Sequence, residues 1–337
     1  MSPPSANSRT LTPVIAPDPA MVARFAGDLA RVFADPKAPL LIAVSGGPDS
    51  VALLLLAREV LGERCVAATV DHGLRAEAAD EARWVADLCA GIGVPHAILT
   101  GALPDRDGRT RNVSARARAF RYDLLRAYAE TTGAAAIATA HHADDQVETV
   151  AMRLNRGAGL SGLAGVRSGN GVVIRPLLGW RRDELAGIVK VCGITPVDDP
   201  SNRDERFERA RLRAALPTAT WIDPVAWTRS AAALADAEEA LAWTVERLWS
   251  ERCVIEEGTV SMSPAGLPFE LRRRLLGRCV TEIDPDANLR GSAVAQAVMA
   301  LKRGATVTLG EALCQPSLDA RDEPVWRFVR ARPRRSS

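Results

Sequence analysis

Short apolar runs alternate with stretches of helical periodicity through the first two-thirds of the chain. Continuous apolar runs bounded by turn-forming residues are typical of strands that are buried on both faces of a sheet. The predicted strands are residues 40–44, 65–70, 94–99, 134–139 and 172–174, and the predicted helices are 51–60, 77–90, 112–130 and 144–155. This alternation predicts an α/β fold, a doubly wound parallel five-stranded sheet with right-handed crossovers and helices on both faces.

The pattern changes after Pro217. An Ala-rich helical stretch follows, and short strand signals return at residues 306–308 and 325–329. We predict a catalytic domain at 21–217, a second, smaller and mostly helical domain at 218–330, and a basic tail at 331–337. The helical stretch contains Trp221, Trp227, Trp243 and Trp249. Their helical spacing favours core packing over stacking on nucleobases.

Composition narrows the class of protein. Residues 1–20 are rich in Pro, Ser and Thr, lack the features of a signal peptide, and are predicted to be a disordered lead-in. None of the six cysteines forms a Cys-x-x-Cys pair, which argues against a zinc or redox site and favours reduced thiols in the cytoplasm. No apolar run approaches the roughly 20 residues that span a bilayer, so we expect no membrane partner. The net charge of +2 argues against an electrostatic nucleic-acid coat protein but allows a local basic face.

The segment between the first predicted strand and helix has the composition of a phosphate-binding loop. It consists of Ser45, Gly46, Gly47, Pro48, Asp49 and Ser50. The two glycines let backbone N–H groups approach an anion, and the helix N-terminus adds unpaired donors and a favourable dipole. Pro48 suits the first helical turn, where its missing N–H costs nothing, and the two serines can donate hydroxyl hydrogens. Asp49 would repel a bare phosphate, so its presence indicates a bridging Mg²⁺.

Taken alone, this loop is also compatible with an ordinary strand-to-helix turn. Two other phosphate-binding motifs are excluded by its residues. There is no Gly-Lys-Ser/Thr of a Walker loop and no Gly-x-Gly-x-x-Gly of a dinucleotide-binding fold.

A second candidate site follows the fourth predicted strand. Asp144, Asp145 and Glu148 form an acidic cluster at a helix N-terminus, where spacings of three and four residues place them on neighbouring positions. The cluster suits Mg²⁺ or an ammonium group, although acidic residues also favour the first helical turn for dipole reasons alone. His141 and His142 immediately before it favour a functional site, with loop hydrogen bonding as the alternative for these histidines.

The loop sequence Ser-Gly-Gly-x-Asp-Ser resembles the signature of the PP-loop ATP pyrophosphatase superfamily, whose fold is that of the adenine nucleotide hydrolases. Five further segments agree in type and order with one family in it: residues 71–75, 141–149, 156–163, 175–178 and 198–202. Together they resemble the tRNA(Ile)-lysidine synthetases over residues 40–217. The chain departs from that family at residue 210, where Ala replaces the Asn of an Arg-Asn-x-x-Arg motif, while Arg209 and Arg213 remain on one helical face.

The resemblance implies a reaction. Lysine is ligated to carbon 2 of the wobble cytidine of an isoleucine tRNA with a CAU anticodon. The reaction passes through an adenylated tRNA, releases AMP and pyrophosphate, and produces lysidine. ATP would be the co-substrate and Mg²⁺ the cofactor, with lysine and the tRNA as partners, and the family allows for a homodimer.

The resemblance also implies roles for individual residues. ATP would be bound by the phosphate loop, residues 45–50, together with Asp71 and His72, and Mg²⁺ by Asp49. Lysine would be bound by Asp144, Asp145 and Glu148. Contacts to phosphates or tRNA would come from Arg118, Arg121, Arg209 and Arg213. Catalytic roles fall to Asp49, Asp145 as proton acceptor, and Arg213.

The arginines around the predicted helix 112–130 could supply part of a tRNA surface. They are Arg106, Arg109, Arg111, Arg116, Arg118, Arg121 and Arg126. Phosphate contacts of this kind give affinity and register. The alternative is a charged exterior helix, which suits most of these residues equally well.

Two other functions remain as alternatives. A tRNA thiolation enzyme of the same superfamily would need paired or reactive cysteines, and the absence of Cys-x-x-Cys counts against it. A sensor that binds ATP without turning it over would need neither the His-His-x-Asp-Asp sequence nor a second domain.

Overall fold

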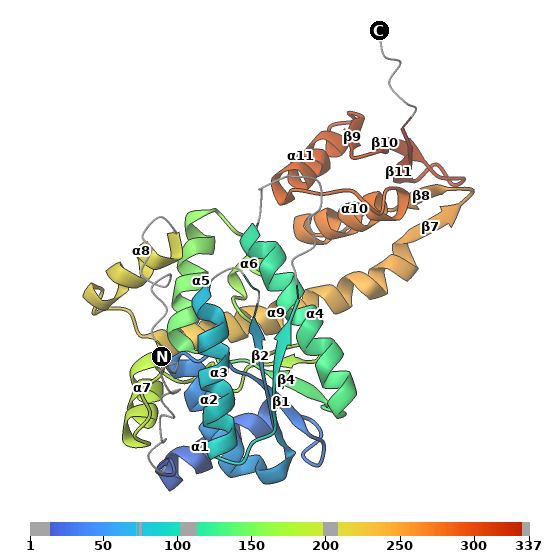
Figure 1. Cartoon of the computed structure of the whole chain (residues 1–337). Helices are drawn as coiled ribbons and strands as arrows, with labels where there is room; N and C mark the ends of the chain where they lie inside the picture. Colours follow the sequence, from blue (N-terminus) through green and yellow to red (C-terminus); the bar gives the residue numbers. More distant parts are fainter. Residues whose placement is uncertain (1–13, 72, 74–75, 102–112, 198–207, 332–337) are drawn as a thin grey trace. The chain divides into compact units, whose positions relative to one another are not determined.

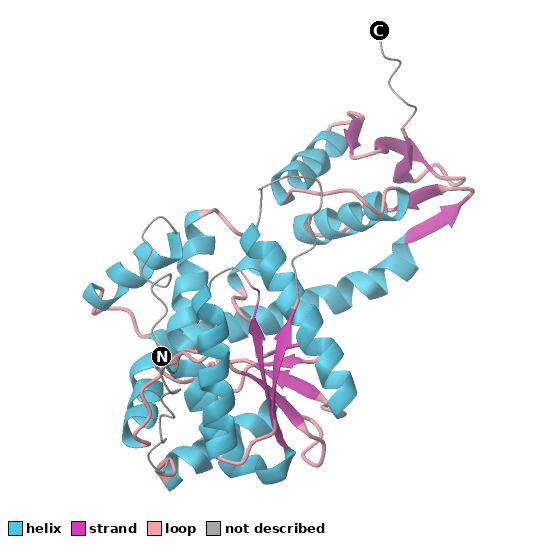
Figure 2. Cartoon of the chain, in the orientation of Figure 1, coloured by secondary structure: helices cyan, strands magenta, loops and turns pink. Residues whose placement is uncertain are grey.

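The computed structural model describes residues 14–71, 73, 76–101, 113–197 and 208–331. The chain divides into two compact units, Met1–Ala235 and Asp236–Ser337. The division falls inside helix α9 (Pro224–Arg252), later along the chain than the boundary predicted after Pro217. Figures 1 and 2 show the elements of each unit by position in the sequence and by type.

The first unit contains a six-stranded sheet of order β3-β2-β1-β4-β6-β5. Its strands are β1 (Leu40–Ala43), β2 (Cys65–Asp71), β3 (His96–Thr100), β4 (Ala136–Ala138), β5 (Gly169–Asn170) and β6 (Val173–Ile174). Every neighbouring pair is parallel except β5 with β6. The predicted parallel five-stranded sheet is therefore confirmed. The sequence did not indicate β5, because two residues, Gly and Asn, form no apolar run.

Helices cover both faces of this sheet, as predicted. The helices of this unit are α1 (Pro19–Val32), α2 (Pro48–Leu61), α3 (Ala76–Gly91), α4 (Val113–Thr132), α5 (Ala143–Asn155), α6 (Leu160–Leu163), α7 (Arg182–Val191) and α8 (Glu208–Ala215). Alternate residues of β1 show the two faces. Leu40 and Ile42 belong to a core built with α1, α2, α3 and α7, whereas Leu41 belongs to a second core built with α4.

Helix α1 begins inside the segment predicted to be a disordered lead-in. Its start is stabilised by Asp18, whose carboxylate accepts a hydrogen bond from the Ala20 N–H at 2.7 Å. Pro19 follows at the first helical position, where no N–H is needed. Phe25 and Leu29 then bury one face of α1 in the core.

The second unit contains a five-stranded antiparallel sheet of order β7-β8-β11-β10-β9. Its strands are β7 (Cys253–Glu256), β8 (Thr259–Met262), β9 (Val307–Leu309), β10 (Ala312–Leu318) and β11 (Pro324–Arg330). Helices α10 (Phe269–Ile283) and α11 (Gly291–Lys302) pack with this sheet around one core. The sequence pattern indicated only β9 and β11 of these strands.

The tryptophans of this region do not all pack in a core, which corrects the interpretation drawn from their spacing. Trp221 is 78% exposed and Trp243 is 62% exposed, while Trp249 packs against the core of the second unit. The Arg247 guanidinium lies 5.0 Å from the ring centre of Trp243. Helical spacing places residues on one face but does not tell which face of a long helix is buried.

All six cysteines lie within the described residues and are free thiols, as expected. None of the helices that the structure describes is long and apolar enough to cross a bilayer.

Candidate functional site

The loop between β1 and α2 is held in shape by its own serines. The Ser50 hydroxyl donates to the Gly47 carbonyl at 2.9 Å and accepts from the Ser45 N–H at 3.1 Å. The two hydroxyl oxygens lie 3.2 Å apart. The Ser50 hydroxyl hydrogen is thus used inside the loop, so Ser50 shapes the phosphate loop, and Ser45 remains the better donor to a ligand.

Gly46 and Gly47 occupy different environments. Gly46 has φ +86°, and a Cβ there would lie 3.1 Å from a methyl carbon of Val197, so only glycine fits without strain. Gly47 precedes the first residue of α2, and no side chain caps that helix end. The first turn of α2 therefore presents its backbone N–H groups to the space beyond β1, as anion binding requires.

Asp49 connects the loop to α5. Its Oδ2 lies 3.4 Å from Nε2 of His142. Its Oδ1 is buried and has no hydrogen-bond partner among the described residues. A buried, unpartnered carboxylate oxygen is costly unless it is compensated, and carboxylate oxygens are the ligands that Mg²⁺ prefers. Asp49 therefore fits the predicted metal role.

His142 lies at the start of α5 and is surrounded by carboxylates. Its side chain is 1% exposed, and its ring nitrogens lie 3.4 Å from Asp49, 3.6 Å from Asp144 and 3.5 Å from Asp145. Burial lowers the pKa of His142, but these neighbours outweigh burial and raise the pKa to about 9. His142 is consequently a cation at neutral pH that joins the phosphate loop to the acidic cluster.

His141 is in the opposite charge state. Burial, together with nearby arginines, lowers its pKa to about 4 despite the opposing effect of Asp145. Its Nδ1 lies 2.9 Å from the Thr139 hydroxyl oxygen, and Arg118 of α4 reaches its Nε2 at 3.5 Å. His141 is therefore neutral, and it places Arg118 beside the cluster, which sequence could not establish.

Glu148 is the most enclosed carboxylate of the cluster, with its side chain 1% exposed. Arg209 and Arg213 donate to it through Nε at 2.7 Å each, and Arg182 donates through Nη2 at 3.2 Å. Burial raises the pKa of Glu148, but the arginines outweigh it and lower the pKa. Both oxygens accept hydrogen bonds, so Glu148 holds the arginine pair of α8 in place.

Asp144 and Asp145 are also paired with cations. Asp144 accepts from the Arg181 guanidinium at 3.2 Å and from the Arg182 backbone N–H at 2.8 Å. Burial raises the pKa of Asp144, but His142 and the Arg182 N–H outweigh it and lower it. Asp145 lies 3.3 Å from Arg209 and accepts from the His142 backbone N–H at 3.1 Å.

The result is a cluster of paired charges at the carboxyl edge of the sheet, with four anions and five cations. Its anions are Asp49, Asp144, Asp145 and Glu148, and its cations are His142, Arg181, Arg182, Arg209 and Arg213. The sequence pattern did not point to Arg181 and Arg182. Their place at the start of α7, soon after the fifth parallel strand, is the signal that could have indicated them.

The remaining predicted residues are placed as follows. Asp71 ends β2, and its carboxylate accepts from the Gly73 N–H at 2.9 Å. Arg121 is exposed on α4. His72, Arg106, Arg109, Arg111 and the segment 198–202 lie outside the described residues.

Comparisons with known proteins agree with this geometry. Residues 21–219 match the PP-loop domain family. The tRNA(Ile)-lysidine synthase of Novosphingobium aromaticivorans is 44% identical over 309 residues, which cover 90% of this chain and 92% of that protein. The tRNA(Ile)-lysidine synthase of Zymomonas mobilis is 40% identical over 304 residues, which cover 88% of this chain and 89% of that protein.

A solved structure supports the fold independently. The U34-tRNA thiolase NcsA of Methanococcus maripaludis, with its [4Fe-4S] cluster, superposes with a TM-score of 0.53 at 16% identity. The match covers 67% of this chain and 86% of that chain. At this identity the likeness extends to the arrangement of strands and helices alone.

Proposed function

Since the chain belongs to the PP-loop family of tRNA(Ile)-lysidine synthases, we propose that it ligates lysine to carbon 2 of the wobble cytidine in an isoleucine tRNA with a CAU anticodon. One observation carries the proposal. His142 joins Asp49 of the phosphate loop to Asp144 and Asp145. A site suited to ATP phosphates therefore adjoins a cluster of carboxylates suited to an amine.

The loop and Asp49 would bind ATP. Backbone N–H groups at the start of α2 and the Ser45 hydroxyl would hold the phosphates, with Asp71 and His72 as further predicted contacts. Mg²⁺ fits the unpartnered oxygen of Asp49, and when bound it would neutralise charge on the phosphates. Among the described residues no ready-made metal cage of three or more ligand side chains exists, which suits a cation shared with substrate phosphates.

In the first step, the carbon-2 oxygen of cytidine would attack the α-phosphorus of ATP. A new O–P bond forms while the bond to pyrophosphate breaks, and the negative charge on the departing pyrophosphate must be neutralised. Arg209 and Arg213 would serve this purpose. Their side chains are 40% and 30% exposed, so they could contact a phosphate ligand as well as Glu148.

In the second step, the lysine amine would attack carbon 2, the bond from carbon 2 to the phosphate oxygen would break, and AMP would leave. The amine must lose a proton, and we assign Asp145 as its acceptor. Asp144, Asp145 and Glu148 are proposed to hold the lysine. Arg209 and Arg213 already donate hydrogen bonds to the Glu148 carboxylate. Lysine could therefore bind Glu148 only after these arginines move towards the phosphates of bound ATP.

The cysteines disfavour the alternative of tRNA thiolation. Burial raises the pKa of Cys65 and of Cys89 to about 12, so neither thiol is a ready nucleophile. Cys192, the other cysteine of the first unit, is buried and its pKa is raised chiefly by burial.

The full chain should be incubated with ATP, Mg²⁺, labelled lysine and an unmodified tRNA transcript. We expect AMP release and incorporation of label, and neither with a transcript that carries uridine at the wobble position. ATP binding without AMP release would favour the sensor alternative. AMP release without lysine incorporation would reject the ligase function. We expect a cytoplasmic enzyme whose second unit binds tRNA, and sedimentation would test the homodimer.

A further inference from the structure

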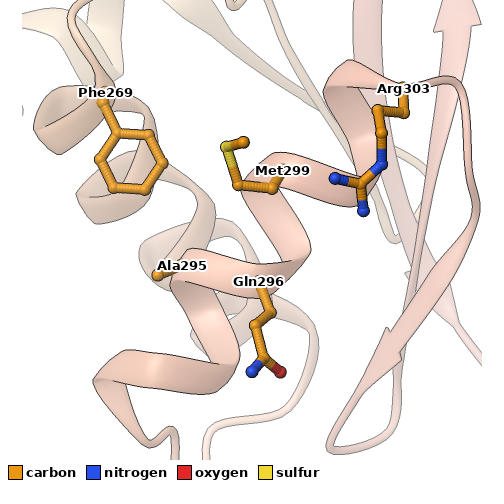
Figure 3. A pocket seen from close by; sticks show the side chains of 5 residues that line it. All are labelled: Phe269, Ala295, Gln296, Met299 and Arg303. Carbon is orange, nitrogen blue, oxygen red and sulfur yellow. The ribbon is translucent and has the colours of Figure 1, made fainter.

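The second unit contains a surface hollow between the start of α10 and one face of α11. It has a volume of about 310 Å³ and is lined by Phe269, Ala295, Gln296, Met299 and Arg303 (Figure 3). Ala295, Gln296 and Met299 lie on α11 and Arg303 is its C-cap residue; their spacings of one, three and four place them on one side of the helix. In Figure 3, Phe269 lies at one side of the hollow, Arg303 at the other, and Met299 between them.

The apolar side chains of this hollow are not used by the core. Phe269 is 44% exposed and Met299 is 45% exposed, whereas Val294, Val298 and Leu301 of the same helix are buried. The opposite face of α11 therefore anchors the helix. The hollow face leaves an aromatic ring and a thioether available to a ligand.

The surroundings of the hollow favour an anionic ligand. Helix α11, which forms one wall of the hollow, contains no acidic residue, and it ends in Lys302 followed by the C-cap residue Arg303. The acid nearest in sequence to Phe269 is Glu270, which is paired with Arg273 and Arg274 at 2.6 Å and 2.7 Å. Charge here is complementary to a phosphate backbone.

We propose that this hollow binds an unpaired nucleotide of the tRNA substrate. The base would stack on Phe269 against Met299, the Gln296 amide would offer a donor and an acceptor to the base edge, and Arg303 would contact the phosphate. An exposed aromatic ring with a cation across the same hollow suits the base and the phosphate of single-stranded RNA. The inference rests on the proposed function only in taking RNA as the substrate.

The first test is the affinity of the full chain for the unmodified tRNA transcript, measured without ATP and lysine. Phe269→Ala should weaken binding roughly tenfold, as expected for loss of one stacked base. Phe269→Trp, which keeps an aromatic face, should bind like wild type, whereas Phe269→Leu, which keeps only apolar bulk, should bind more weakly. Leu318→Ala, which changes another exposed apolar residue of the same unit, is the matched control and should bind normally.

The second test is the salt dependence of binding. Arg303→Gln should lower the slope of log affinity against log salt by about one, while Arg321→Gln in the turn between β10 and β11 should leave it unchanged. Irradiation of a tRNA transcript containing 4-thiouridine should crosslink it to the peptide containing Phe269 or Met299.

Unchanged tRNA affinity of Phe269→Ala would overturn the proposal. So would a Leu variant that binds as well as wild type, because apolar contact alone would then suffice. Loss of self-association with normal tRNA affinity would assign the hollow to contact between copies and equally overturn it. Because these assays need no catalysis, tRNA binding through the hollow without lysidine formation would reject only the proposed function.

Discussion

The phosphate loop and the charged cluster on α5 are neighbours, but they differ in how far their carboxylates are paired within the protein. The loop leaves Asp49 Oδ1 without a partner among the described residues and offers no side-chain cap to α2. The cluster pairs each of its carboxylates with a cation, and the fully enclosed Glu148 accepts from three arginines. The loop therefore leaves a carboxylate oxygen open to a ligand, whereas the cluster pairs its carboxylates internally.

This difference suggests an order of binding. A carboxylate buried as deeply as Glu148 is stable only while it remains paired. A lysine ammonium could take the place of an arginine there, but only if that arginine gains another anion. ATP phosphates in the neighbouring loop would supply such an anion, so ATP should open the cluster to lysine.

The largest expected effect is at the loop. Asp49→Ala should lower AMP release by roughly a thousandfold or more, because it removes the unpartnered oxygen assigned to Mg²⁺ and a charge beside His142. Steady-state assay of AMP measures this. Asp80→Ala, which removes an exposed acid on α3 that is paired with Arg83, is the control. Near-normal AMP release from Asp49→Ala would remove its metal role.

The next effect is at the cluster. Glu148→Gln should raise the KM for lysine at least roughly tenfold, because the cluster loses an anion and its arginines lose their anchor. Unfolding by urea should show a loss of about 2 kcal/mol, less than for a fully buried pair since the arginines are partly exposed. Glu208→Gln, which loosens an exposed pair with Arg156, should change neither. An unaltered lysine requirement in Glu148→Gln would end the assignment of the cluster to lysine.

A smaller effect tests the link between the two regions. The folded-state pKa of His142 is raised to about 9, so its charge stabilises the fold fully below its unfolded pKa of about 6.5. That stabilisation should decline as pH rises and vanish above pH 9. The difference in unfolding free energy between wild type and His142→Asn, measured across pH, should follow this curve. A difference that does not change between pH 6 and pH 10 would show that His142 is neutral.

His96 supplies a control of opposite sign. Burial lowers the pKa of His96 in the folded state. The contribution of His96 to the free energy of unfolding should therefore fall as pH drops below about 6.5.

The smallest effect separates loop shape from general backbone strain. Gly46→Ala and Gly93→Ala both place a side chain at positive φ and should each cost about 1–2 kcal/mol. A Cβ at Gly93 meets open space, whereas at Gly46 it meets Val197 at 3.1 Å. Only Gly46→Ala should raise the KM for ATP, by several-fold. Equal ATP kinetics in both variants would show that the loop tolerates displacement.

The contrast between regions also explains what sequence could predict. The parallel strands could be predicted from the sequence, because a strand that is buried on both faces, such as β1, is a continuous apolar run. Strand β7 was not predicted. Most of its residues are exposed, so buried and exposed positions do not alternate along it as they do in a half-buried strand. The loop motif could be recognised in the sequence because its residues are consecutive.

The cluster was less predictable because its partners are distant in sequence. Glu148 meets Arg209 and Arg213 only through tertiary folding. Sequence placed both arginines near phosphate but could not show that a carboxylate holds them. The opposite charge states of His141 and His142 likewise depend on burial and neighbours, which composition does not reveal.

Detection of lysidine in the tRNA product tests the proposed function most directly. After reaction of the full chain with ATP, Mg²⁺, lysine and unmodified isoleucine tRNA, the tRNA should be digested and its nucleosides analysed by mass spectrometry. We predict that cytidine at the wobble position is replaced by its lysine adduct, with one AMP released per adduct. An unmodified wobble cytidine after AMP release, or a sulfur-containing nucleoside in its place, would contradict the claim.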